Sequence, residues 1–503
     1  MSLAIVISRA SAGIEAPAIQ VEVHITGGLP KFAIVGLPEA TVRESKDRVR
    51  SAIINTRFEF PRRRITVNLA PADLPKNGGR YDLPIAVGIL AATGQLKKDR
   101  LEEHELIGEL ALDGSLRGTG GALPAALCSR EAKRILVVPQ DDAPEALLAT
   151  EARIKAARHL GEVHAHLSGD DIPAPSEAMQ HARPAAAEDL RDVKHQYRAR
   201  RALEIAAAGN HHLLMLGPPG TGKTMLAMRL PGVLPPMSEA EALESAMVRS
   251  VSVLGFDAEQ WGVRPFRAPH HSASPAAIVG GGATPNPGEI SLAHHGVLFL
   301  DELPEFSRIV LEALREPIES GHITISRASR KTSFPARFQL IGAMNPCPCG
   351  TLGDPAGLCR CTDEQISRYR ARISGPLLDR IDLHVDVPRL RADDDASPSP
   401  ESSAQVGERV AEARARQIAR NGKPNQGLSV GDIQRHCPID EGSQKLLRAA
   451  MQKLHLSARS RDGSLRIART IADLAQKERI EDGHLAEALS LRSFDRGKGP
   501  DRR

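Results

Sequence analysis

The stretch that decides the fold of the central part of this chain is GPPGTGKT, at residues 217–224. It has the spacing of a phosphate-binding loop, in which glycines let successive backbone N–H groups turn inward around an anion. The apolar run 213–216 before it predicts a buried strand, and the run 225–228 after it predicts a helix start that favours bound phosphate. The residues expected to hold ATP or GTP are Gly217, Pro218, Pro219, Gly220, Thr221, Gly222, Lys223 and Thr224.

Hydrolysis needs more than a binding loop, and two acids further along the chain suit it. Lys223 can reach the β- and γ-phosphates, and Thr224 can offer its hydroxyl to Mg²⁺. Residues 297–300 (VLFL) predict a buried strand that ends in Asp301 and Glu302. Asp301 is the expected partner of Mg²⁺, and Glu302 is the expected base that orients the attacking water.

Two further polar side chains follow predicted elements of the same central part. The run 338–344 predicts another buried strand, and Asn345 directly after it can hold the attacking water or the γ-phosphate. Arg380 lies in a turn from which it can reach a nucleotide bound by a neighbouring subunit, where it would stabilise transition-state charge. The residues alone equally allow a surface ion pair with Asp379 or Asp382.

Composition sets the broad class of the chain. Its 503 residues suggest about three domains, and 41% hydrophobic and 25% charged residues are ordinary for a globular protein. The net charge of +4 requires no nucleic acid, so any basic surface must be local. Aromatic residues make up 3%, which disfavours a broad base-stacking platform. No run reaches the roughly 18 apolar residues of a membrane helix, and residues 1–9 predict a strand and not a signal peptide, so we expect no membrane partner and a cytoplasmic location.

Two stretches rich in Pro, Ala, Ser or Asp, at 171–189 and 391–405, indicate linkers. The predicted division is 1–168, an α+β domain; 169–188, a linker; 189–388, a parallel sheet covered by helices; 389–404, a linker; 405–496, a helical domain; and 497–503, a tail. The first domain should hold strands at 19–25, 65–69 and 134–139, with 83–92 either a helix or a buried strand. The last domain should hold helices at 406–419 and 465–474.

Four cysteines stand close together in a C-x-C-x₉-C-x-C pattern, at Cys347, Cys349, Cys359 and Cys361. In a cytoplasmic chain such a cluster suggests tetrahedral Zn²⁺ that braces the loop carrying Asn345. A redox-active cluster and simple reduced thiols are the alternatives. Cys128 and Cys437 are isolated and expected to be buried.

Two segments of the central part have the character of substrate-contacting insertions. One is 266–282, with Arg267, His270 and His271, and the other is 322–334, which predicts two strands around a basic tip. The tip cations are Arg327, Arg330 and Lys331. They suit a hairpin that grips DNA phosphates without reading sequence, and an ordinary solvated hairpin is the alternative.

The motifs GPPGTGKT, GVLFLDEL, IGAMNPCPCG and ISGPLLDRIDLHV resemble those of AAA+ ATPases of the magnesium-chelatase type. The whole chain more closely resembles the ComM/YifB family of bacterial proteins. The further segments that carry this resemblance are GLPEATVRES at 36–45, NLAPA at 68–72, FRAPHH at 266–271, PGEISLAH at 287–294 and ARTIADL at 468–474.

The resemblance implies roles for individual residues. Lys223 and Thr224 would form the Walker A pair, and Asp301 and Glu302 the Walker B pair. Asn345 would be sensor 1, Arg380 the arginine finger acting in trans, and Arg466 the sensor 2 arginine, with Arg469 its competitor on the same helix. The implied cofactors are ATP and Mg²⁺. The implied assembly is a homo-oligomeric, hexameric ring that acts on DNA as a helicase or branch-migration factor in transformation or recombination.

The sequence departs from the family pattern near the expected adenine pocket. His195 stands where glycine is usual, and Asn210-His211-His212 replaces the usual Gly-His-Asn. These departures leave the details of that pocket open.

The first domain resembles the protease domain of Lon, but Arg80-Tyr81-Asp82 stands where the nucleophilic serine should fall. No serine lies between Thr66 and Leu101, so we reject proteolysis. Such a domain would scaffold the ring or bind duplex DNA, with Arg62-Arg63-Arg64 either a contact or a solvated edge. The remaining alternative is a chelatase-like metal-insertion motor, against which we weigh the fused first domain, the cysteine cluster and the absence of a D-x-S-x-S motif.

Overall fold

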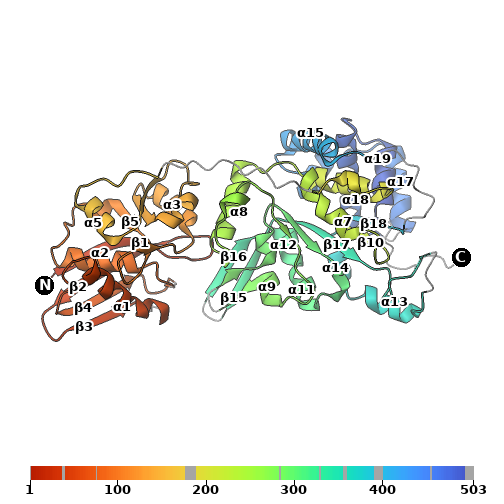
Figure 1. The fold of residues 1–503 in the computed structure, drawn as a ribbon. Helices are drawn as coiled ribbons and strands as arrows, with labels where there is room; N and C mark the ends of the chain where they lie inside the picture. The colour runs from red at the N-terminus through yellow and green to blue at the C-terminus, as the bar shows by residue number, and fades with distance from the viewer. Residues whose placement is uncertain are drawn as a thin grey trace.

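The structure is a computed structural model that describes residues 2–36, 40–74, 76, 78–175, 188–282, 285–327, 330–354, 359–389, 400–453 and 456–492. Three parts follow one another along the chain: a mixed α/β part, a central part around a parallel sheet, and a helical part (Figure 1). Much of both predicted linkers and the whole predicted tail lie outside the described residues. Among the described residues, no helix combines the length and apolar character that a membrane crossing needs.

The N-terminal part is built on a seven-stranded sheet with the order β3-β4-β2-β1-β5-β8-β9. Its strands are β1 Ser2–Arg9, β2 Ala18–Thr26, β3 Lys31–Val35, β4 Arg64–Ala70, β5 His104–Leu106, β8 Ile135–Pro139 and β9 Arg153–Ala157, and β6 Glu109–Leu110 pairs with β7 Leu116–Arg117 beside it. Its helices are α1 Ala40–Asn55, α2 Asp82–Ala92, α3 Ala122–Glu131, α4 Ala143–Ala146 and α5 Leu160–Ser168. This α+β arrangement is consistent with the Lon-like domain that the resemblance implies.

The structure resolves one element that the sequence left open in this part and confirms another that it predicted. The ambiguous run 83–92 is a helix, α2, and all 11 of its residues are buried because it packs on β1 and β2. In β2 buried residues alternate with more exposed ones, as a half-buried strand requires.

The central part holds a parallel sheet with the order β11-β14-β17-β10-β18. Its strands are β10 Leu213–Leu216, β11 Phe266–Arg267, β14 Val297–Leu300, β17 Gln339–Met344 and β18 Leu383–Asp386. Its helices are α6 Tyr197–Gly209, α7 Lys223–Arg229, α8 Glu239–Ser250, α9 Pro275–Val279, α10 Glu289–Leu292, α11 Arg308–Ala313, α12 Arg315–Ser320, α13 Asp363–Arg370 and α14 Gly375–Leu378. Every residue of β14 and β17 is buried, as expected for strands covered on both faces.

Two hairpins leave this core, β12 Gly280–Gly281 with β13 Asn286–Pro287, and β15 His322–Arg327 with β16 Arg330–Pro335. The second confirms the predicted pair of strands at 322–334. The first hairpin lies at the end of the segment 266–282, which the sequence predicted to be an insertion. The predicted start of this insertion was wrong, because Phe266–Arg267 is β11, the edge strand of the core sheet. The two-residue strand is too short for a pattern to show it in sequence.

The C-terminal part consists of α15 Ser403–Asn421, α16 Val430–His436, α17 Glu441–Lys453, α18 Ala458–Leu474 and α19 Asp482–Ser490. The N-termini of α15 and α16 carry capping boxes on Ser402 and Ser429, which satisfy backbone N–H groups left free there. The helix α18 packs against α19, α6 and α15, and every residue from Gly463 to Asp473 except Arg466 is buried, so the helical part rests on the helix that precedes the phosphate loop.

The N-terminal part packs on the central part through α8 (Figure 1). Ala242, Ala246 and Trp261 share an apolar cluster with residues of α3, α4 and β8. The Ser250 hydroxyl donates to the buried Glu145 carboxylate, which also accepts the Leu123 N–H at 2.8 Å. The contact is therefore apolar with a buried polar pair at its end.

Candidate nucleotide site and cysteine cluster

The phosphate loop joins β10 to α7 in a strand–loop–helix unit, as the sequence predicted. Gly220 and Gly222 take left-handed φ angles of 75° and 89°, which glycine adopts without strain. A Cβ on Gly217 would lie 2.1 Å from the Val387 carbonyl oxygen, so only glycine fits beside β18. The glycines are thus required by the geometry of this loop, and the backbone is free to surround an anion.

Lys223 and Asn345 meet inside the loop. The Lys223 Nζ donates to the carbonyl oxygens of Gly217 at 2.7 Å and Pro218 at 2.8 Å, and to the Asn345 Oδ1 at 3.2 Å. Burial lowers the pKa of Lys223. Lys223, the first residue of α7, and Asn345, which follows β17, therefore converge where the phosphates of a nucleotide would lie.

The proposed magnesium ligands converge at the same place. The Thr224 hydroxyl donates to the Asp301 Oδ2 at 2.6 Å, and the Asp301 Oδ1 accepts the Glu302 N–H at 2.9 Å. A hydroxyl and a carboxylate are the hard oxygen donors that Mg²⁺ uses beside phosphate oxygens. These residues fit Mg²⁺, which when bound would neutralise phosphate charge.

Glu302 is held by a residue that sequence reasoning did not assign to the site. Its carboxylate Oε2 lies 3.3 Å from the His271 Nδ1, and the His271 ring meets Phe306 edge-on with centroids 6.4 Å apart. Glu302 itself has a left-handed φ of 51°, which is uncommon for a non-glycine residue. The sequence predicts that His271 belongs to the substrate-contacting segment 266–282. No motif in the sequence indicates that it contacts Glu302.

Arg380 is engaged within its own chain. Its Nη2 lies 2.6 Å from the Glu319 Oε1, and Arg459 of α18 contacts the same carboxylate. The Arg380 side chain is only 9% exposed. These contacts engage Arg380 within its own chain, and its role as an arginine finger toward a neighbouring subunit stays a prediction.

The two arginines of α18 differ in their surroundings. Arg469 is 1% exposed, pairs with Asp473 and donates from Nη1 to the Glu478 carbonyl oxygen at 2.6 Å, so it stabilises the C-terminal end of its helix. Arg466 is half-buried and donates to the Leu428 carbonyl oxygen at 2.6 Å. Among the described residues, neither arginine forms a hydrogen bond or an ion pair with the phosphate loop of its own chain, so the sensor 2 role of Arg466 stays a prediction.

The four cysteines of the 347–361 segment come together. The Sγ of Cys347 lies 3.3 Å from that of Cys349, and the Sγ of Cys359 lies 3.7 Å from both. All four thiols, including that of Cys361, lie within 4.8 Å of one another. A tetrahedral Zn²⁺ with Zn–S bonds of about 2.3 Å needs S···S separations of about 3.8 Å, so the donor set fits zinc.

This cysteine loop touches the phosphate loop directly. A Cβ on Gly350 would lie 2.7 Å from the Pro219 Cδ and 3.9 Å from the Asn345 Cγ, and Gly350 has a left-handed φ of 80°. The Arg370 guanidinium donates to the Pro346 carbonyl oxygen at 3.2 Å. The cysteine loop thus braces both Asn345 and the phosphate loop. Cys437 is buried and Cys128 is half-buried, as isolated thiols away from this cluster.

The candidate DNA contacts have separate outcomes. Arg267 forms a bidentate pair with Glu289, at 2.6 and 2.7 Å, so it would have to leave this carboxylate to contact a phosphate, and its role as a DNA contact stays a prediction. Arg327 and Arg330 are paired opposite each other in β15 and β16, while their side chains lie outside the described residues. Lys331 is exposed next to them.

Two of the residues that depart from the family pattern, His195 and Asn210, stand where the backbone has a left-handed conformation. His195 and Asn210 both have a φ of 60°, the left-handed conformation that glycine takes freely and Asn tolerates at a helix end. Gln196 donates to the Thr221 carbonyl oxygen at 3.4 Å, so 195–196 does lie beside the phosphate loop. The expectation for 210–212 was wrong, because these residues precede β10 and lie at the opposite end of the sheet from the loop.

Stability should fall in acid because a histidine is buried in its neutral form. His212 is 2% exposed, its Nδ1 accepts the Leu340 N–H at 2.9 Å, and burial lowers its pKa from 6.5 to about 4. Between pH 6.5 and about 4 the unfolded state takes up a proton that the folded state refuses, so stability is lost as pH falls through this window. His212→Asn, which keeps an acceptor for Leu340, should flatten the decline in Tm between pH 6.5 and 4.5; an unchanged slope would show that other groups cause it.

Comparison with protein-family models shows the class of protein to which this chain belongs. A family model described as magnesium chelatase, subunit ChlI, matches residues 189–395, one described as subunit ChlI of Mg-chelatase matches 21–142, and one described as its C-terminal part matches 400–492. The chain is therefore a magnesium-chelatase-like AAA+ protein.

The proteins that resemble this chain over its full length form a smaller family within this class. The chain is 52% identical to YifB of Salmonella typhimurium over 498 residues, covering 99% of this chain and 98% of that protein. It is 50% identical to the competence protein ComM of Haemophilus influenzae over 503 residues, with coverage of 99% and 98%. A magnesium-chelatase subunit ChlI of Chlorella vulgaris is 28% identical over 134 residues, which is 25% of this chain and 35% of that protein. The chain belongs to the YifB/ComM family.

Proposed function

We propose that the protein hydrolyses ATP with Mg²⁺ and uses the energy to move DNA strands through a homo-oligomeric, hexameric ring, as a helicase or branch-migration factor in transformation or recombination. The observation that carries the proposal is the convergence of Lys223, Thr224, Asp301 and Asn345 at one end of the parallel sheet. Full-length similarity to a competence protein supports DNA as the substrate.

Each residue has a role in the proposed reaction. Lys223 and the loop N–H groups bind and orient the phosphates, and Asp301 with Thr224 would hold Mg²⁺. Glu302 would accept a proton from the attacking water, and Asn345 would position that water against the γ-phosphate. His271 orients the Glu302 carboxylate through its 3.3 Å contact.

The proposed DNA grip is the hairpin β15–β16, with its cations Arg327, Arg330 and Lys331 near the turn. The hairpin is anchored along β16, because Phe334 is buried in the core and a Cβ on Gly13 of the N-terminal part would lie 2.7 Å from the Thr332 Cγ2, two residues from Arg330. An anchored hairpin with charged residues at its turn suits a rigid contact with DNA phosphates. Phosphate contacts of this kind carry no sequence information, which a general motor requires.

The structure and the comparisons bear on the two alternative functions, proteolysis and a chelatase-like metal-insertion motor. Proteolysis is disfavoured further, because the buried Arg80 guanidinium donates to the Gly120 carbonyl oxygen at 2.8 Å, where a nucleophile would need access. The fused N-terminal part no longer argues against a chelatase-like motor, since a ChlI-type model matches 21–142. What favours the DNA motor is that similarity extends over the whole chain to YifB and ComM, and over only 25% of it to the Chlorella subunit.

The test is ATP turnover by the purified chain with and without DNA, followed by strand displacement on a three-strand junction. We expect DNA to stimulate turnover and the junction to be resolved. Lys223→Ala is the inactive control, and Lys331→Ala should keep basal turnover while reducing the stimulation. Turnover that ignores DNA, with no displacement, would reject the proposal.

We also propose that Cys347, Cys349, Cys359 and Cys361 hold one structural Zn²⁺ per chain. Metal analysis of the purified protein should find about one equivalent, and Cys349→Ser should lose it and lower the Tm, because metal binding energy is folding energy in such sites. Cys128→Ser, a half-buried thiol outside the cluster, is the matched control and should keep the metal. Metal-free protein with a wild-type Tm would leave the four residues as reduced thiols.

A further inference from the structure

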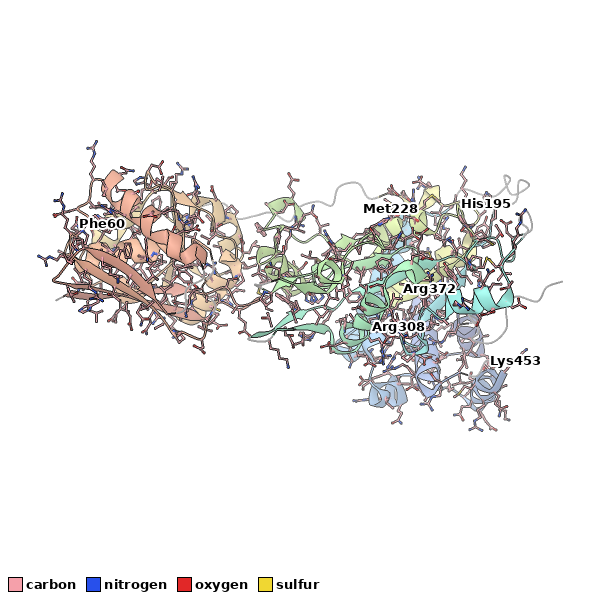
Figure 2. The ribbon with its side chains drawn as sticks, turned by 90° about the horizontal axis from the view of Figure 1, so that it is seen from below. Phe60, His195, Met228, Arg308, Arg372 and Lys453 are labelled. Carbon is pink, nitrogen blue, oxygen red and sulfur yellow. The ribbon has the colours of Figure 1, made fainter. Side chains whose placement is uncertain are left out.

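A second basic surface lies at the end of the molecule remote from the nucleotide site. It is a groove of about 560 Å³ between β3, the outer strand of the seven-stranded sheet, the C-terminal half of α1, and the segment 59–63 that leads into β4. Figure 2 shows Phe60 at this end, far from Arg308 and Arg372 of the central part. We refer to it as the outer groove.

The outer groove carries a concentrated positive charge. Five cations line it against two carboxylates, Asp47 and Glu59, although the whole chain has a net charge of only +4. The cations are Lys31, Lys46, Arg50, Arg62 and Arg63. In the described part of the chain, none of these five cations forms a hydrogen bond or an ion pair with another side chain, and all are exposed or half-buried. Unpaired like charges in a concave site repel one another and favour an anion between them.

Two aromatic rings lie among these cations. Phe32 on β3 and Phe60 are both half-buried, with ring centroids 6.1 Å apart and planes inclined at 44°. The Arg50 guanidinium lies 5.6 Å from the Phe60 centroid. Phenylalanine rings beside cations are the means by which proteins hold single strands, because bases stack on the rings while cations meet the phosphates.

We propose that the outer groove binds single-stranded DNA. The inference rests on DNA being the substrate, as proposed above, but not on the motor or its hairpin. Bases in a duplex are stacked on one another and cannot reach rings that lie inside a groove, so a duplex could use only the cations. The site is a local pair of rings, which is compatible with the scarcity of aromatic residues in the chain.

The test is fluorescence anisotropy of a labelled oligothymidylate with the full chain, without nucleotide, at several salt concentrations. Phe60→Leu keeps apolar volume and removes the ring, and we expect it to weaken binding about 5-fold or more. Phe58→Leu is the matched control, since Phe58 lies two residues away against His164, with centroids 4.5 Å apart, and outside the groove lining. It should bind as the wild type does.

The contribution of the groove cations is measured separately, through the salt dependence of DNA binding. Arg62→Gln with Arg63→Gln should make the slope of log K against log salt shallower by about 1.4, which corresponds to two single-strand phosphate contacts. Lys97→Gln with Arg117→Gln removes the same charge from exposed positions elsewhere on the N-terminal part and should leave the slope unchanged.

The proposal is overturned if the groove variants bind as the wild type, if Phe58→Leu is equally impaired, or if a vesicle of anionic phospholipid displaces the oligonucleotide from the groove. Its failure is separable from that of the motor. Lys223→Ala and Lys331→Ala should retain groove binding, and Phe60→Leu should retain basal ATP turnover. Loss of DNA-stimulated turnover with groove binding intact would reject the motor alone.

Discussion

Replacing Lys223 by alanine is expected to lower ATP turnover by about 10²–10³-fold, because one preorganised charge on the reacting phosphates is removed. The Lys223 ammonium lies within the loop and contacts Asn345, so its loss also removes one of the groups that would orient the γ-phosphate. The measurement is steady-state phosphate release at saturating ATP, with nucleotide binding followed separately by a fluorescent analogue. Binding should weaken together with turnover.

Glu302→Gln is the comparison that separates binding from chemistry. It should lower turnover by about 10²–10⁴-fold through loss of the general base while nucleotide binding persists. The Glu302 side chain is about half exposed and pairs with His271, so the isosteric amide should not disturb the fold. If Glu302→Gln turned over ATP at the wild-type rate, the assignment of the base would be wrong.

Arg380→Ala is expected to lower turnover by about 10³–10⁵-fold, and the defect should appear in the neighbouring subunit. Within one chain Arg380 pairs with Glu319, so it must leave this carboxylate to reach a nucleotide across an interface. Mixing Arg380→Ala with Lys223→Ala tests this directly. Some interfaces would then combine an intact phosphate loop with an intact arginine, and part of the activity should return.

The matched control for Arg380 is Arg459→Ala, because Arg459 contacts the same Glu319 carboxylate from α18. Its loss should leave turnover within a few-fold of wild type, since Glu319 keeps Arg380 as a partner. Two inactive variants that fail to complement each other when mixed would show that Arg380 acts within its own chain or only structurally.

The sequence predicted the central fold because its signals are local. The apolar run VLFL at 297–300 and the largely apolar run at 338–344 are each followed by a polar residue and predict short buried strands, and the structure has them as β14 and β17. The run 83–92 stayed ambiguous because an element buried on every side has no periodicity in its pattern. The short edge strand at 266–267 was missed because two residues carry no pattern at all.

In the candidate site, too, the residues in local motifs were predicted, whereas contacts between distant segments were not. Lys223, Thr224, Asp301 and Asn345 were predicted from motifs, and the structure brings their side chains together. His271 beside Glu302 and Gly350 against Pro219 were not predicted, because each pair is made by segments whose approach depends on packing. Arg267 was predicted as a DNA contact, its pair with Glu289 was not predicted, and no spacing rule links these two residues.

The sequence by itself determined which chemical groups are available, because the phosphate loop and the cysteine cluster are recognised by spacing along the chain and the acids by their place at the end of an apolar run. Only the tertiary structure decided which charges are available. It pairs Arg267 and Arg380 with carboxylates, whereas the cations of the outer groove around Phe32 and Phe60 have no carboxylate partner among the described residues. Whether a charge is neutralised depends on which side chains the fold places within a few ångströms of it, and those partners are distant in sequence.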